Sequence, residues 1–388
     1  MDEPKITTID FFMTERCNMD CSYCFHPKKD SDLDLEQGKK ILDAMYEVNP
    51  DEMAIAFWGG EPLLLPQLVL DLAKYARYEK WKDFEQDNIK VMRTKFHLVT
   101  NGTHFDEELF KQFRELDFTI QVSLDGDVNT HKEHRGSEEN HAKICANIKK
   151  MLLIFPDLSV RMTFTTKTVG RLAQNVQFIR DLGVVKIMYH ATMEEEWTDE
   201  LVSHFMHQLE NVFNYRRWLK KNDVAIEVAF VDKTLRILNG ETGPELEFCQ
   251  AGKTYLAILP NGDVYPCHRA ASNRVFKLGN LFNKRKFMRG IFLKLDKDYT
   301  GCSSCDAWKT CHSCPITHYM VNKDLALPLK ENGYCNICKA ENYHTREYLQ
   351  TELADNNERK IKNLSMVLVD VAEQNAEILK LLKENKNE

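Results

Sequence analysis

Three cysteines near the amino terminus, Cys17, Cys21 and Cys24, fall within eight residues in the stretch TERCNMDCSYCFHP. Disulfides use cysteines in pairs, and a tetrahedral zinc ion takes four ligands, so three thiols fit neither arrangement directly. The spacing indicates a metal-binding role. One candidate is a zinc site that borrows a fourth ligand such as His26.

A second group of cysteines occupies the carboxyl-terminal third of the chain. Eight of the twelve cysteines lie there: Cys249, Cys267, Cys302, Cys305, Cys311, Cys314, Cys335 and Cys338. Eight thiols divide into two complete sites of four. CxxC pairs suit zinc as well as iron, so a zinc-ribbon-like module is one interpretation. The remaining cysteine, Cys145, is most simply a buried helix residue.

Composition narrows the class of protein. The chain has 388 residues, 43% of them hydrophobic and 29% charged, which is typical of a soluble globular protein with two domains. A net charge of −7 gives no electrostatic support to a nucleic-acid partner. No apolar run is long enough for a membrane span or export signal, so we expect a cytoplasmic protein without a membrane partner. In a reducing compartment, twelve cysteines favour metal binding or catalysis over disulfides.

Predicted strands and helices, which must position these cysteines, alternate along the chain. Short β-branched runs predict strands at residues 6–14, 53–58, 95–100, 118–123, 158–166 and 184–190. Amphipathic segments predict crossover helices between them, and a helix at residues 198–221 closes the region. Because crossovers between parallel strands are right-handed, six consecutive units predict an α/β fold with a partial (β/α)6 TIM-like barrel.

The pattern changes near residue 240, where turn-rich sequence begins. We therefore expect three parts: a barrel at residues 1–235, a small metal-stapled domain at 236–345, and a long carboxyl-terminal helix at 346–388, which lacks Gly and Pro. That last segment places Ile361, Leu364, Leu368, Val371, Ile378 and Leu382 at heptad a and d positions, with Asn375 at an a position. The pattern predicts a parallel homodimer or packing on the chain's own body.

Small or polar motifs follow successive predicted strands. The cysteine triad follows the first, GGEP (59–62) the second, TNGT (100–103) the third, and SLDG (123–126) ends the fourth. Each motif alone is turn chemistry. Four of them at the carboxyl ends of parallel strands predict an active site at that end of the barrel.

The CxxxCxxC spacing with Tyr23, together with FWGGEP, resembles the signature of radical S-adenosylmethionine (SAM) enzymes over roughly residues 5–230. In that family three thiolates hold a four-iron, four-sulfur (4Fe–4S) cluster, and the fourth iron is left for SAM. The resemblance implies an oxidoreductase that cleaves SAM reductively to a 5′-deoxyadenosyl radical, with an external one-electron donor.

The resemblance also implies roles for matching residues. Tyr23 would lie near the adenine, and the glycine-rich motif near the methionine amino group. A serine and an aspartate would lie near the ribose, and an arginine near the methionine carboxylate. The cofactor-binding residues so expected are Tyr23, Gly59, Gly60, Glu61, Ser123, Asp125 and Arg135.

The later cysteines follow a pattern, C…GxxxxC…CxxCxxxxxC…C, that resembles the SPASM extension with its two auxiliary clusters. One site would use Cys249, Cys267 and Cys314 with Cys335, and the other Cys302, Cys305, Cys311 and Cys338. The chain departs from the pattern at CHSC, which has two residues between cysteines where three are usual. The cofactors implied are three 4Fe–4S clusters and SAM. If all eight thiols bind iron, the auxiliary clusters serve electron transfer or support.

SPASM relatives modify ribosomal peptides or proteins. We expect a maturase that forms a crosslink (thioether, carbon–carbon or cyclophane) or a related oxidation. The first alternative is an anaerobic sulfatase-maturating, formylglycine-forming enzyme. In that group an aspartate base follows the cysteine of GxxxxC; here His268 stands there as a weak catalytic candidate. The second alternative is a non-catalytic metal-binding scaffold that dimerises through its last helix. Only sixteen residues precede Cys17, so a separate leader-peptide-binding protein is one expected partner.

Overall fold

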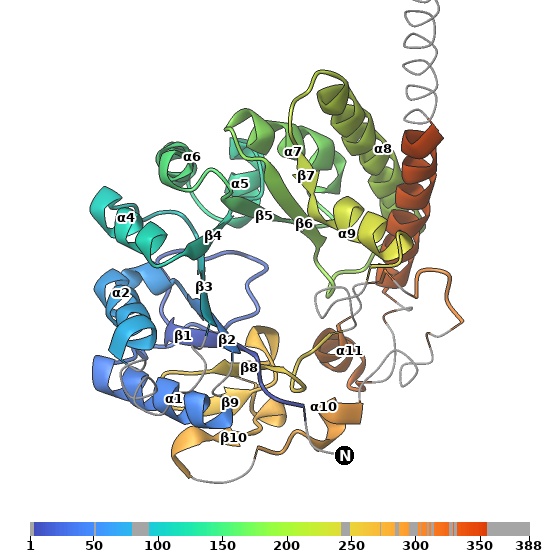
Figure 1. Ribbon diagram of the computed structural model, residues 1–388. Coiled ribbons are helices and arrows are strands. Elements are labelled where there is room, and N and C mark those ends of the chain that lie inside the picture. Colours follow the sequence, from blue (N-terminus) through green and yellow to red (C-terminus); the bar gives the residue numbers. More distant parts are fainter. Residues whose placement is uncertain are drawn as a thin grey trace, which may run out of the picture.

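A computed structural model describes residues 4–49, 52–79, 93–241, 249–271, 273–283, 287–294, 314–325 and 332–354, with shorter pieces between 302 and 311 and at 329. Its centre is a curved, largely parallel sheet with helices along its outer side (Figure 1). No helix in these ranges is long and apolar enough to cross a membrane.

The six expected strands are present and stand in sequence order. They are β1 (Thr8–Thr14), β2 (Glu52–Gly59), β3 (Arg93–Thr100), β4 (Phe118–Ser123), β5 (Ser159–Phe164) and β6 (Lys186–Ala191). Each pairs in parallel with the next, and the two-residue β7 (Glu227–Val228) follows β6. Inward- and outward-facing side chains alternate along β5 and β6. The partial TIM-like barrel is confirmed.

The crossover helices begin where the sequence supplies caps. These helices are α1 (Leu35–Val48), α2 (Pro66–Lys74), α4 (Glu107–Glu115), α5 (Val128–His134), α6 (Glu138–Ile154), α7 (Leu172–Asp181) and α8 (Asp199–Lys221). In five of them the residue before the helix caps a backbone N–H with its side chain: Asp34, Asp106, Asp127, Ser137 and Thr198. Short turns complete the region: η1 (Pro62–Leu64), the π-helical η2 (Tyr75–Glu79) and η3 (Val169–Arg171).

The cysteine-rich region extends the barrel sheet rather than forming a sheet of its own. Its first strand, β8 (Tyr255–Ile258), pairs in parallel with β1, and Ile9 is opposite Leu256. Antiparallel β9 (Asp263–Tyr265) and β10 (Gly279–Asn280) follow outward. The other elements are α9 (Ala229–Leu238), η4 (His268–Ala270), η5 (Arg274–Phe276), η6 (Leu281–Asn283), α10 (Gly290–Lys294) and α11 (Pro315–Asn322). This region therefore flanks the first barrel strand.

A helix at residues 334–354 packs against the end of the barrel. The buried Arg216 of α8 joins it to α9: its NH1 donates to Tyr348 Oη at 2.9 Å and to Glu352 Oε1 at 3.0 Å, and its NH2 to Asp232 Oδ1 at 2.8 Å. The carboxyl-terminal helix therefore begins before residue 346. The heptad positions from Ile361 onward, and the homodimer predicted from them, lie outside the described residues, and the three domain limits stay a proposal.

Candidate active site

A cavity of about 410 Å³ opens at the carboxyl ends of the barrel strands. Its wall combines residues from both ends of the chain that the sequence analysis singled out: Cys17, Cys21, Tyr23, Cys24, Gly59, Gly60, Glu61, Ser123, Arg135, Cys249, Cys267, His268 and Cys314. The amino-terminal cysteines and one carboxyl-terminal group thus face the same space. Because β8 pairs with β1, residues about 240 positions apart meet here.

Hydrogen bonds from the residues after β3 and from helix α5 hold the loop that carries Cys17, Cys21 and Cys24. Asn101 Nδ2, after β3, donates to Asn18 Oδ1 at 2.8 Å and lies 3.9 Å from Cys17 Sγ. Ser22 N donates to His134 O at 2.8 Å, and Ser22 Oγ lies 2.9 Å from His134 Nδ1. Sequence reasoning treated Asn101 as turn chemistry and missed His134. The loop is positioned by the fold itself.

The two glycines of the GGEP motif allow β2 to end directly against this loop. Gly60 N donates to Thr14 O at 2.9 Å, and Glu61 N donates to Arg16 O at 2.8 Å. A Cβ atom on Gly59, whose φ is +142°, would stand 2.2 Å from Thr14 O, and one on Gly60 would stand 2.0 Å from Arg16 O. Only glycine permits this approach of two backbones.

Glu61 is a buried carboxylate that ties the end of β2 to the end of β3. It is 2% exposed, and it accepts hydrogen bonds from Thr100 Oγ1 at 2.7 Å, Leu63 N at 3.0 Å and Asn101 N at 2.6 Å. Burial raises the pKa of Glu61 to about 7, although these hydrogen bonds oppose the rise. Its first role is thus to fix the loop that holds Asn101. A contact with the methionine amino group stays a prediction.

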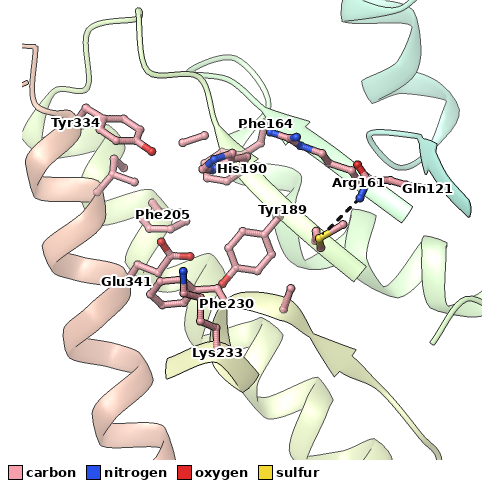
Figure 2. Close-up of a pocket in the computed structure, with 14 residues that line it drawn as sticks. Gln121, Arg161, Phe164, Tyr189, His190, Phe205, Phe230, Lys233, Tyr334 and Glu341 are labelled. Atoms are coloured by element: carbon pink, nitrogen blue, oxygen red, sulfur yellow. Dashed lines mark hydrogen bonds between the residues drawn. The ribbon is translucent and has the colours of Figure 1, made fainter. Parts of the chain in front are cut away.

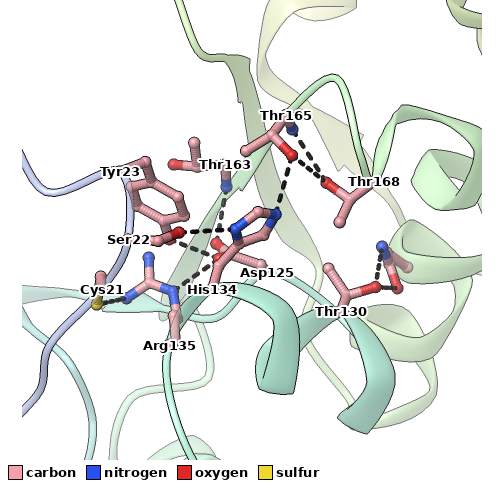
Figure 3. Close-up of polar contacts among 12 residues, drawn as sticks. Cys21, Ser22, Tyr23, Asp125, Thr130, His134, Arg135, Thr163, Thr165 and Thr168 are labelled. Carbon is pink, nitrogen blue, oxygen red and sulfur yellow. Dashed lines mark hydrogen bonds and ion pairs between the residues drawn. The ribbon is translucent and has the colours of Figure 1, made fainter.

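Asp125 organises Tyr23 and Arg135 from behind the cavity wall (Figure 3). The carboxylate is fully buried; Oδ2 accepts from Tyr23 Oη at 2.5 Å and Arg135 Nε at 2.9 Å, while Oδ1 accepts from Thr163 N at 2.8 Å. Arg135 NH1 lies 4.0 Å from Cys21 Sγ. Asp125 is not part of the cavity wall, and its hydrogen bonds position Tyr23 and Arg135; the ribose contact that the resemblance implies stays a prediction.

The thiols around the cavity suit a cationic or electron-deficient partner that replaces their protons. Burial raises the pKa of Cys17 and Cys21. Burial and then the neighbouring Cys314 thiol raise the pKa of Cys249 and Cys267. Burial thus favours the protonated thiols, and a metal centre that binds these cysteines has to replace their protons. Within the described residues, no three Cys, His, Asp or Glu side chains are grouped closely enough to hold a single metal ion.

The second carboxyl-terminal group lies at the start of helix 334–354. A thiol contact with Cys311, followed by burial, raises the pKa of Cys338, and Cys335 adds to the rise. Cys305 N donates to Cys302 O at 3.0 Å. Cys335 is thus beside the second group, and its assignment to the first group stays a prediction. Cys145, half-buried on α6, lies apart from these groups, 3.7 Å from His141 Nε2.

His268 reaches the cavity with two partners that the sequence analysis did not name. Its Nδ1 lies 2.6 Å from Asp10 Oδ2 and 2.9 Å from Tyr255 Oη, which also donates to Asp10. Its ring stacks on Trp58 at 4.3 Å between centroids. Asp10 is the one charged residue in strand β1, TIDFFMT, and a single charge in an otherwise apolar strand could have identified it as a functional residue from the sequence.

Family models identify the class of protein that this fold and cavity define. Residues 11–179 match the radical SAM superfamily, and residues 249–315 match the SPASM iron–sulfur cluster-binding domain. The chain belongs to the radical SAM superfamily and carries a SPASM domain, so it is an enzyme, and both domains imply 4Fe–4S clusters and SAM. The resemblance read from the two cysteine patterns is confirmed.

Three particular relatives extend the match. An uncharacterised protein of Methanocaldococcus jannaschii is 24% identical over 281 residues, 71% of this chain and 88% of the relative. AlbA, an antilisterial bacteriocin subtilosin biosynthesis protein of Bacillus subtilis, is 26% identical over 285 residues, 70% of this chain but 57% of AlbA. A cysteine-type anaerobic sulfatase-maturating enzyme of Clostridium perfringens is 24% identical over 361 residues, 83% of this chain and 91% of the relative.

Two solved structures share the fold. Native anSMEcpe with bound AdoMet and Cp18Cys peptide superposes with a TM-score of 0.69 at 17% identity, over 90% of this chain and 99% of the other. Streptococcus suis SuiB bound to its precursor peptide SuiA gives a TM-score of 0.58 at 15% identity, over 83% and 75%. At these identities the likeness establishes the arrangement of elements and no particular reaction.

Proposed function

We propose that this enzyme modifies a ribosomally made peptide or protein at an unactivated carbon, by forming a crosslink or a related oxidation. The observation that carries the proposal is the shared cavity, in which the amino-terminal cysteines and the group of Cys249, Cys267 and Cys314 face one another. The peptide-bound structures of anSMEcpe and SuiB, and the biosynthetic role named for AlbA, support a peptide as the substrate.

In this proposal each group of residues has a definite task. Cys17, Cys21 and Cys24 hold one 4Fe–4S cluster, and the eight later cysteines hold two more. The cluster and SAM, when bound, supply the electron and the carbon radical that the protein lacks. Tyr23, Ser123 and the motif of Gly59, Gly60 and Glu61 orient SAM, and Asp125 holds Tyr23 and Arg135 in place. His268 stands beside the first auxiliary group.

Anaerobic reconstitution tests the proposal. We expect about twelve irons per chain, four for each of three clusters, and formation of 5′-deoxyadenosine from SAM when a strong one-electron reductant is added. Co-expression with short open reading frames from the gene neighbourhood should then give a peptide whose mass falls by hydrogen atoms. Iron near four per chain together with bound zinc contradicts the auxiliary clusters, and absence of 5′-deoxyadenosine contradicts the radical mechanism.

The second candidate is formylglycine formation in a sulfatase. The match to a cysteine-type anaerobic sulfatase-maturating enzyme, over 83% of this chain and 91% of the relative, favours it. The position of His268, which lines the cavity and is held by Asp10, favours it too. The Cp18Cys peptide is a direct probe. Conversion of its cysteine to an aldehyde, detected with an aminooxy reagent, would establish this reaction. If the enzyme cleaves SAM but leaves the peptide unmodified, the result favours the crosslinking proposal instead. A separate leader-binding protein remains part of the first proposal.

A further inference from the structure

A second cavity of about 300 Å³ adjoins the active-site cavity inside the open side of the barrel. The two cavities share three wall residues: Arg161, His190 and Ala191. Apart from these, its wall comes from β4, β5, β6, α8, α9 and helix 334–354. It is rich in aromatic rings: Phe164, Tyr189, Phe205, Phe230 and Tyr334 (Figure 2). None of the cysteines borders it. Arg161 stands where the two spaces meet.

Arg161 differs from the other arginines around these cavities in having no acceptor. Arg135 is paired with Asp125, and Arg269 is paired with Glu194 and donates to Thr317 Oγ1 at 2.6 Å. For the Arg161 guanidinium, no carboxylate and no other hydrogen-bond acceptor is found among the residues that the structure describes. Burial and then the charge of Arg269 lower its pKa. Figure 2 shows the side chain lying between Gln121 and His190.

Arg161 is half-buried where the two cavities meet, so its guanidinium gives up part of its water without gaining an acceptor among the described residues in exchange. Removing a cation from water without a partner is strongly unfavourable, and a guanidinium stays charged instead of releasing its proton. A planar carboxylate is the natural partner, since it accepts two parallel hydrogen bonds from the fork of a guanidinium. The site therefore lacks an anion that comes with a ligand.

We propose that Arg161 binds a side-chain carboxylate of the peptide substrate, so that the substrate carries an acidic residue close to the modified position. The inference rests on the proposed function. The methionine carboxylate of SAM is the other source of this chemistry, and Arg135 is better placed for it: Arg135 NH1 lies 4.0 Å from Cys21 Sγ, whereas Arg161 stands where the active-site cavity meets a second cavity that none of the cysteines or GGEP residues borders. The aromatic wall beyond Arg161 suits an apolar neighbour of the acidic residue.

The test uses reconstituted enzyme with SAM and two pools of synthetic heptapeptides, acetylated and amidated at their ends. The pools are randomised at every position except the centre, which is Asp in one and Asn in the other. Recovery on the immobilised enzyme is counted by mass spectrometry. A charge-assisted pair predicts that the Asp pool is enriched about tenfold over the Asn pool. Arg161→Gln should lower that ratio to about one, and Arg161→Lys should leave an intermediate ratio.

The matched control is Arg236→Gln, because Arg236 is exposed on α9 and pairs with Glu241 away from both cavities. The Arg236→Gln variant should enrich the Asp pool over the Asn pool as strongly as the wild type does. Circular dichroism and iron content show whether each variant is folded, and the wild-type ratio tests the proposal without any variant. Equal recovery of the two pools, including recovery of neither, overturns the inference. So does a fall in SAM affinity in Arg161→Gln with the Asp preference intact, since the carboxylate would then be that of SAM. Formation of 5′-deoxyadenosine by the wild type reports separately on the proposed function.

Discussion

The two cysteine regions are held in different ways. The loop of Cys17, Cys21 and Cys24 is fixed by backbone and side-chain hydrogen bonds from β2, the residues after β3, and α5. The first carboxyl-terminal group is joined to the barrel mainly along the edge of β1, where β8 and β9 carry Cys249 and Cys267. An open site for a cosubstrate requires a fold that keeps its shape without the fourth ligand. A site filled by four thiols can take its shape from the metal.

The largest effect should come from removing the open site. Replacing Cys17, Cys21 and Cys24 together by Ala should abolish formation of 5′-deoxyadenosine, because no cluster remains to reduce SAM, while about eight irons stay bound. Chromatography of the nucleoside and iron analysis check both parts. The matched control, Cys145→Ala, changes a thiol outside both groups and should keep full activity. Nucleoside formation by the triple variant would refute the assignment.

Removing all metal should separate the two regions. Oxidative chelation is expected to raise amide exchange in residues 249–271 by about 100-fold, because that segment loses the cross-link between its thiols. Residues 52–59 of β2, which the sheet holds on both sides, should change less than about threefold. Hydrogen–deuterium exchange with mass spectrometry measures both. Equal loosening of the two segments would contradict a loop that is held by the fold.

Gly60→Ala should break the close approach of β2 and the cysteine loop. The added methyl group would meet Arg16 O at 2.0 Å, and both partners are backbone, so neither can rotate away. We expect a loss of about 3 kcal/mol in the free energy of unfolding and impaired cluster binding. Gly290→Ala is the control, since a Cβ there meets nothing within 4 Å. Urea unfolding of the metal-free proteins compares the two; similar stabilities would show that the loop yields easily.

Glu61 should make stability depend on pH in a direction that most carboxylates do not. Its pKa rises from 4.5 to about 7 on folding. The folded state therefore holds the proton more tightly, and stability falls as pH rises from about 4.5 to about 7, by on the order of 3 kcal/mol. The slope should be absent in Glu61→Gln. Urea titrations of metal-free protein between pH 5 and 8 test this, and a wild-type curve without that slope would contradict it.

Local sequence patterns predicted the strands of the barrel well, but they did not predict the contacts between segments that lie far apart in the chain. The six strands were expected within a few residues of their observed limits, because alternating apolar runs such as FTIQVS encode one strand at a time. The pairing of β8 with β1 could not be predicted in this way, since it depends on two short segments far apart in the chain. The hydrogen bonds of Glu61 with the turn at Asn101, and of Asp125 with Tyr23, arise from the same kind of distant contact.

The site was predicted mainly through the spacing of its cysteines. The motifs GGEP and SLDG were singled out because they follow successive strands, and residues 59–61 and Ser123 from them line the cavity. The sequence pattern could not distinguish residues that face the cavity, such as Ser123, from those that stand behind the wall, such as Asp125. Nor could it single out Arg161, because an arginine in a strand becomes unusual only once its surroundings lack an acceptor.

The pairing of β1 with β8 also has a consequence for how the chain is made. Until Tyr255–Ile258 leaves the ribosome, one edge of β1 has no partner, although β2 has long been available on the other. An uncovered strand edge is a site of improper association. Truncated chains that end before residue 255 should therefore aggregate during synthesis. The SPASM region thus supplies cysteines and also pairs with the edge of β1, which stays exposed until this region is made.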